Sequence, residues 1–262
     1  MATSAIIVAH PGHELRVFHW MEQARPLYCC ITEGSGGAAS SRMPSTDEVL
    51  TRVGAQAGPI YGRFPDKEIY RLLIGGRAEV FVALARELAD ALVAAGIEHV
   101  VGDAAEGFNP THDVCRFVID GAVAIVRART GRELGNQDFV LDSQPDSCPD
   151  AVRASATWIR LDDAALERKI DAAMQYPELR DEVQMALARY GRPAFAIECL
   201  RPVTTRLRLE AFARELPAYE RYGEQRVREG RYDQIIRYRQ HVLPVWAAID
   251  ASVEGRLADV AP

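Results

Sequence analysis

The stretch Ser4-Ala5-Ile6-Ile7-Val8, with Ala9-His10-Pro11-Gly12-His13-Glu14 directly after it, decides the fold of this chain. A short apolar run that contains β-branched residues is typical of a buried strand. Proline and glycine then break the strand, and the segment from Glu14 onward can begin a helix. The sequence therefore predicts a strand-to-helix corner of the kind where open α/β sheets place their ligands.

The alternation of strand and helix continues along the chain. We predict strands at 4–9, 27–32, 59–64, 97–102, 138–142 and 194–203, and helices at 14–24, 76–95, 112–129 and 163–175. This order is typical of the α/β class, with a Rossmann-like, mostly parallel sheet flanked by helices. After Pro202 the residues become charged and helical. We therefore expect one domain over 1–203 and a helical C-terminal extension over 204–262. The extension would pack on that domain or on a second copy in a homo-oligomer, or would act as a lid that brings an Arg or Tyr to the substrate.

Three histidines stand at predicted strand-to-helix corners. His10 and His13 follow the first strand, and His112 follows the run His99-Val100-Val101 and precedes a helix. Neighbouring parallel strands would bring the three imidazoles together. Three ligands and an open position are the pattern of a catalytic zinc site, although imidazole also suits iron, nickel and copper. The alternative is a set of polar residues in tight loops, and His19, His99 and His241 are expected to be structural or exposed.

The motifs resemble those of the PIG-L-like (LmbE-like) zinc-dependent N-deacetylases. That family opens with Ala-His-Pro-Asp-Asp-Glu, where this chain has Ala9-His10-Pro11-Gly12-His13-Glu14. Its Thr-x-Gly-Glu-x-Gly turn is similar to Thr32-Glu33-Gly34-Ser35-Gly36-Gly37, and its His-x-Asp-His motif is similar to Asn109-Pro110-Thr111-His112. Weaker similarities are found at Lys169, Tyr176-Pro177 and Glu198. The resemblance covers about residues 4–200 and implies that His10 and His112 are metal ligands.

The departures from the family pattern concern the chemistry itself. Gly12 stands where the family has its general-base Asp, and His13 replaces an Asp ligand but can still bind a metal. Asn109 replaces a His that polarises the carbonyl, and an amide can donate a hydrogen bond to an oxyanion. The metal would then be held by three neutral imidazoles. Such a site keeps its full positive charge, which can lower the pKa of bound water to about 7.

A leaving amine must also receive a proton, so a replacement acid is required. The carboxyl groups near the predicted ligands are Glu14, Glu33, Glu106 and Asp113. We predict Glu14 or Asp113, because each adjoins a ligand. The competing roles are packing for Glu14 and capping of the next helix for Asp113.

Composition excludes several other classes. The net charge of −6 argues against a nucleic-acid binder that depends on phosphate contacts. No apolar run approaches the roughly 20 residues of a membrane helix, and no secretory signal is apparent. Five cysteines without CxxC spacing predict reduced, buried thiols and a cytoplasmic location.

Two functions remain open from the sequence. The first is a metal-dependent hydrolase that acts on an N-acyl amino sugar or a related N-acyl amine, through metal-bound hydroxide. The second is a PIG-L-like metal-binding protein that has lost deacetylase chemistry and binds a ligand or catalyses another reaction. The absence of Asp at position 12 favours the second, and the three retained ligands favour the first.

Overall fold

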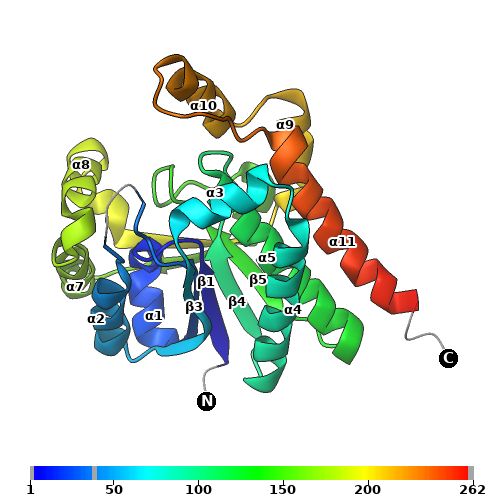
Figure 1. Ribbon diagram of the computed structural model, residues 1–262. Coiled ribbons are helices and arrows are strands. Elements are labelled where there is room, and N and C mark those ends of the chain that lie inside the picture. The colour runs from blue at the N-terminus through cyan, green and yellow to red at the C-terminus, as the bar shows by residue number, and fades with distance from the viewer. Residues whose placement is uncertain (1–2, 37–39, 259–262) are drawn as a thin grey trace.

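The computed structural model describes residues 3–36 and 40–258, and within them seven strands form one sheet (Figure 1). The strand order is β3-β2-β1-β4-β5-β7-β6. The strands are β1 (Ser4–Val8), β2 (Leu27–Thr32), β3 (Gln56–Phe64), β4 (His99–Asp103), β5 (Gly135–Phe139), β6 (Thr157–Arg160) and β7 (Ile197–Pro202). Strands β1 to β5 pair in parallel, whereas β7 pairs antiparallel with both β5 and β6. The predicted α/β class with a mostly parallel sheet is confirmed.

The helices lie on both faces of the sheet and beyond its edge (Figure 1). They are α1 (Phe18–Ala24), α2 (Met43–Val53), α3 (Asp66–Ile74), α4 (Ala78–Ala94), α5 (Pro110–Thr130), α6 (Asp150–Arg153), α7 (Asp163–Met174), α8 (Arg180–Tyr190), α9 (Thr205–Arg214), α10 (Ala218–Arg228) and α11 (Leu243–Ala258). Short 3-10 turns are η1 (His13–Val17), η2 (Pro177–Leu179) and η3 (Arg192–Ala196), and η4 (Tyr238–Val242) is a π-helical turn.

Alternate residues of the buried strands enter two separate cores. Ile7 and Cys29 face a core built with α3, α4, α5 and α11, whereas Ile6 and Tyr28 face one built with α1 and α2. This is the period of two that a strand covered on both faces requires. The central position of β1 follows from its register, since Ile7 is paired with Cys29 on one side and Gly102 on the other.

Several predicted boundaries need correction. The segment 14–24 is a 3-10 turn followed by α1, because Val17 leaves helical geometry at φ −122°. The strand predicted at 138–142 lies earlier, at Gly135–Phe139, and the one predicted at 194–203 begins only at Ile197. Helices α2, α3 and α8 and strand β6 were not predicted.

The C-terminal region is helical, as predicted, and packs on the sheet domain. The rings of Phe117 in α5 and Trp246 in α11 meet edge to face at 5.3 Å. Phe212 and Ile249 belong to the same core cluster as α4 and α5. The division at residue 203 stays a prediction. Among the described residues no helix is both long and apolar enough to cross a membrane, and all five cysteines are buried and free.

Candidate metal centre

The carboxyl edge of the sheet brings together the three predicted imidazoles. The ring centroids of His10, His13 and His112 lie 5.3, 5.2 and 4.6 Å apart. His10 follows β1 by two residues, His13 begins η1, and His112 lies in the first turn of α5. The convergence follows from the parallel pairing of β1 with β4, which aligns their carboxyl ends.

Local sequence builds each corner. Gly12 has φ +100°, a left-handed conformation that glycine adopts without a Cβ penalty, and it turns the chain from β1 into η1. Asn109 is the N-cap of α5, and its Oδ1 accepts a hydrogen bond from the backbone N–H of Thr111 at 2.8 Å. Pro110 then occupies the first helical turn, where its missing N–H costs nothing. His112 is fixed by this capped helix start.

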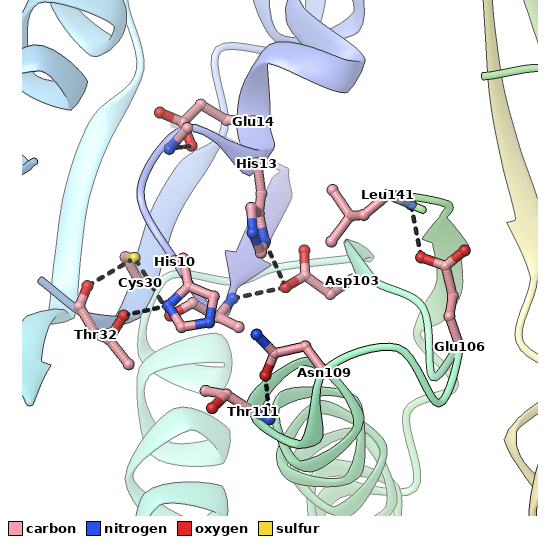
Figure 2. Close-up of polar contacts among 12 residues, drawn as sticks. His10, His13, Glu14, Cys30, Thr32, Asp103, Glu106, Asn109, Thr111 and Leu141 are labelled. Carbon is pink, nitrogen blue, oxygen red and sulfur yellow. Dashed lines mark hydrogen bonds and ion pairs between the residues drawn. The ribbon is translucent and has the colours of Figure 1, made fainter. Parts of the chain in front are cut away.

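Two carboxyl groups that the sequence did not single out contact these imidazoles (Figure 2 shows one of them). Asp103 Oδ2 lies 2.8 Å from His13 Nδ1 and also accepts the backbone N–H of Ala9 at 2.8 Å. Asp66 Oδ1 lies 2.9 Å from His10 Nδ1, and Thr32 Oγ1 lies 2.7 Å from the same nitrogen. Two of the three predicted ligands therefore have a carboxyl group behind the ring.

The sequence held only a weak signal for these two groups, because acidic residues at such positions are common. Asp103 is the last residue of β4, and Asp66 is the first residue of the helix after β3. Each is an acidic residue at the carboxyl end of a strand, the edge at which the histidines were already placed. Only the strand order shows which imidazole each one meets.

Burial sets the protonation of the cluster. It lowers the pKa of His13 and His112 well below the usual value, and neighbouring imidazoles lower it further. Burial raises the pKa of Asp103 to about 7, against the hydrogen bond from Ala9. Burial also works against ionisation of Asp66, but its hydrogen bond and charge interaction with His10 hold the pKa well below the usual range. His13 and His112 are thus neutral near pH 7, the form in which imidazole binds a metal.

The donors fit a divalent metal in kind, although the side chains are not arranged around one. Among the described residues, no group of three or more His, Cys, Asp or Glu side chains could hold a metal ion as it stands. Two buried ring nitrogens, His10 Nε2 and His112 Nδ1, nevertheless have no hydrogen-bond partner. Metal-binding histidines usually give their other ring N–H to a carboxylate, as His10 and His13 can do here.

The two carboxyls predicted to transfer a proton are engaged elsewhere. Glu14 is fully buried, accepts hydrogen bonds from Gly12 N, Tyr28 and Thr46, and points away from the imidazoles in Figure 2. Asp113 Oδ1 accepts the backbone N–H of Gly107 at 3.0 Å, while Oδ2 is buried without a partner. Burial raises the pKa of Asp113 to about 7 and also raises that of Glu14. Neither carboxyl is hydrogen-bonded to His10, His13 or His112.

Other residues singled out from the sequence have structural roles. Glu106 accepts the backbone N–H groups of Leu141 and Asp142 at 2.7 and 3.2 Å and so holds a neighbouring loop. Lys169 forms a buried ion pair with Glu198 at 2.8 Å. His19 lies in α1 beside Glu22, outside the cluster of imidazoles.

The space beside Gly12 is filled by neighbouring side chains. A Cβ on Gly12 would lie 2.2 Å from Leu179 Cδ1 and 3.6 Å from Tyr176 Cζ. Leu179 ends the turn η2 and Tyr176 directly precedes it, so this segment packs on the corner between the two histidines. A side chain at this position would require the Leu179 side chain to shift.

The α/β fold of this chain is similar to that of several solved structures, two of which are deacetylases by name. The structure titled "The crystal structure of antimicrobial reagent A40926 pseudoaglycone deacetylase Dbv21" matches at a TM-score of 0.54 and 18% identity, over 78% of this chain and 98% of that one. The structure titled "The crystal structure of the zinc inhibited form of teicoplanin deacetylase Orf2" matches at 0.52 and 13%, over 77% and 98%.

The conserved protein TT1542 from Thermus thermophilus matches at a TM-score of 0.56 and 17% identity, over 78% of this chain and 97% of that one. No family model matches the chain, and no curated protein matches it. At these identities the likeness establishes the fold, and the activity has to be argued from the site.

Proposed function

We propose that this protein is a metal-dependent amide hydrolase that removes the acyl group from an N-acyl amino sugar or a related N-acyl amine. The observation that carries the proposal is the convergence of His10, His13 and His112 at the carboxyl edge, with carboxyls behind two of them. The names of two structural neighbours, both deacetylases, support this reaction class. The substrate is then a small molecule rather than a nucleic acid or a lipid surface.

The chain's own residues have separate tasks in this proposal. His10, His13 and His112 would hold zinc or another divalent ion, which when bound supplies a Lewis acid for the amide carbonyl. Asp66 lies behind His10, 2.9 Å from its Nδ1, and can hold that ring in place. Asn109 uses its Oδ1 as the helix cap, so its Nδ2 is the atom that can donate to the oxyanion of the substrate.

Glu14 and Asp113, the two carboxyls predicted to protonate the leaving amine, differ in their hydrogen bonding. Both oxygens of Glu14 accept hydrogen bonds, whereas Asp113 keeps Oδ2 without a partner. With a pKa of about 7, raised by burial, Asp113 can hold and release a proton near neutral pH. We assign the proton transfer to Asp113 ahead of Glu14, with Glu14 bracing the corner at Gly12.

The second candidate, a metal-binding protein without deacetylase chemistry, is favoured by one specific observation. Leu179 fills the space beside Gly12 that a general base would need. A protein that has lost that base and closed its position could keep the metal for binding or for another reaction. The two candidates differ in turnover and agree in metal content.

The test begins with the metal content of the purified protein. His10→Ala and His112→Ala should lose stoichiometric metal after dialysis, whereas His19→Ala, a control outside the cluster, should keep it. The wild-type protein is then screened against N-acyl amino sugars and other N-acyl amines, with chelator and with metal restored. Chelator-sensitive release of the acyl group supports the hydrolase. Metal retention by His10→Ala or His112→Ala would show that the ligands are wrong, and metal-loaded protein without turnover would favour the second candidate.

The proton-transfer assignment has its own kinetic test. Asp113→Asn should reduce turnover by about a hundredfold or more at unchanged metal content, the usual scale for a general acid. Glu14→Gln should reduce it less and should lower stability instead, since Glu14 accepts three hydrogen bonds. Full activity in both variants would mean that neither carboxyl is the acid.

A further inference from the structure

We propose that Asp103 is the positioning residue for His13, holding its imidazole so that Nε2 is presented to the metal. This inference rests on the proposed function only in requiring that the three imidazoles bind a metal. Asp103 is fully buried, and its Oδ2 lies 2.8 Å from His13 Nδ1. None of the three motifs quoted above for the resemblance includes Asp103.

The first step of the argument is the rigidity of the acceptor. The same Oδ2 accepts the backbone N–H of Ala9 at 2.8 Å, at the end of the neighbouring strand β1. Ala9 itself is fully buried, and its carbonyl accepts the N–H of Thr32 at 3.0 Å. The carboxyl group is thus fixed between two paired strands, so that it can impose one orientation on the imidazole.

The second step concerns the tautomer. A neutral imidazole carries its proton on either Nδ1 or Nε2, and the hydrogen bond made by one nitrogen decides the role of the other. With the proton on Nδ1, His13 donates to Asp103 Oδ2 and keeps a lone pair on Nε2. Asp103 Oδ2 already accepts the Ala9 N–H, so the opposite tautomer would place a second acceptor, His13 Nδ1, 2.8 Å from it. Asp103 therefore selects the tautomer in which Nε2 can bind a cation.

The third step is that His13 depends on one partner alone. His10 Nδ1 contacts both Asp66 and Thr32, whereas Asp103 is the hydrogen-bond partner that the structure gives His13 Nδ1 among the described residues. His13 lies on a 3-10 turn, and its side chain remains 15% exposed. Removal of the Asp103 carboxylate should therefore release this ring more than any other single change.

The experiment is a double-mutant cycle on zinc affinity, measured by competition with a chromophoric chelator. Asp103→Asn should weaken zinc binding by about 10–100-fold, the usual cost of losing such a partner. In the His13→Ala background the same substitution should have little further effect, because Asp103 acts through His13. A purely structural role would give the same loss in both backgrounds, and that result would overturn the proposal.

A matched control and a second measurement keep the test decisive. Asp138→Asn neutralises a buried carboxylate on the adjacent strand β5 that pairs with Arg201 at 2.7 Å, and it should leave zinc affinity unchanged. Nitrogen-15 NMR of the wild-type protein without metal should place the His13 proton on Nδ1. A proton on Nε2 would overturn the proposal even if Asp103→Asn does not fold.

The outcomes also distinguish this proposal from the proposed function. Protein that binds zinc with a coupled His13–Asp103 pair, but turns over no N-acyl amine, would support the positioning role and refute the hydrolase. If the effects of Asp103→Asn and His13→Ala on zinc affinity are additive in an enzyme that turns over an N-acyl amine, the hydrolase would be supported and the positioning role refuted. Wild-type protein that binds no zinc would refute both.

Discussion

The carboxyl of Asp113 is buried, and its protonation links the stability of the protein to pH. Burial raises its pKa to about 7, whereas the unfolded chain releases this proton near pH 3.9. Between about pH 4 and pH 7 the folded state therefore binds more protons than the unfolded state, and stability falls as pH rises through this window. His13 and His112 affect stability in the opposite direction. Their pKa values are lowered in the folded state, so their contribution to stability is lost as the pH drops.

Asp113→Asn isolates the first effect. An amide cannot release the proton, so the variant should gain stability relative to wild type as the pH is raised from about 5 to about 8. The measurement is urea unfolding of both proteins at the two pH values. His13 and His112 contribute equally to the unfolding free energy of wild type and variant at each pH, so their effect cancels in the comparison. A difference in unfolding free energy that stays constant with pH would show that Asp113 is already ionised in the folded protein at the lower value.

The corner between His10 and His13 is closed by the turn η2, and Gly12 is the residue on which the two elements meet. A Cβ there would face Leu179 Cδ1 at 2.2 Å, and the backbone is left-handed at φ +100°. Gly12→Ala should therefore combine a backbone cost of about 1–2 kcal/mol with an overpacking cost of about 1–3 kcal/mol. Gly12→Asp should accordingly destabilise the corner rather than restore a general base.

Gly131 supplies the control for this prediction. It has φ +70° with nothing within 4 Å of its Cβ position, so Gly131→Ala measures the backbone cost alone. Adding Leu179→Ala should recover part of the loss in Gly12→Ala and none in Gly131→Ala. Chemical denaturation of the four variants gives the comparison. Equal losses at the two glycines would mean that η2 yields freely.

The elements that could be predicted are those with strong apolar patterns. β1, β2 and β4 are almost entirely buried, and α4 has a regular apolar face. β6 has no such pattern, since Thr157–Arg160 is a short edge strand with every residue partly or fully exposed. Its antiparallel pairing with β7 depends on tertiary contacts, which the local pattern of apolar residues does not show.

At the scale of the whole molecule, some residues of the candidate site could be predicted from the sequence and others could not. The three histidines could be found because each follows a strand and carries a distinctive side chain. Asp66 and Asp103 could not, because an acidic residue at a helix start or a strand end is common and usually serves as a cap or meets solvent. Their importance comes from the sheet order, which places β4 beside β1 and the start of α3 beside His10.

The C-terminal helices should unfold together with the sheet domain, because they share its core and contact the loop that precedes α5. Tyr219 donates its backbone N–H to Gly107 at 3.2 Å, in the loop that leads to Asn109. Ile249 of α11 packs so closely on α5 that a Cβ on Gly121 would lie 2.2 Å from its Cγ2. The three tryptophans, Trp20 in α1, Trp158 in β6 and Trp246 in α11, can report on the separate regions.

Ile249→Ala should lower the unfolding free energy by about 2–5 kcal/mol, because it leaves a cavity in the shared core. Single-tryptophan proteins that retain Trp20, Trp158 or Trp246 should show coincident transitions that shift together in this variant. Leu207→Ala is the matched control, since Leu207 is 57% exposed and its loss should change stability by no more than about 0.5 kcal/mol. An early transition at Trp246 alone would show that residues 204–262 fold as a separate unit, and that the extension does not stabilise the edge carrying the three histidines.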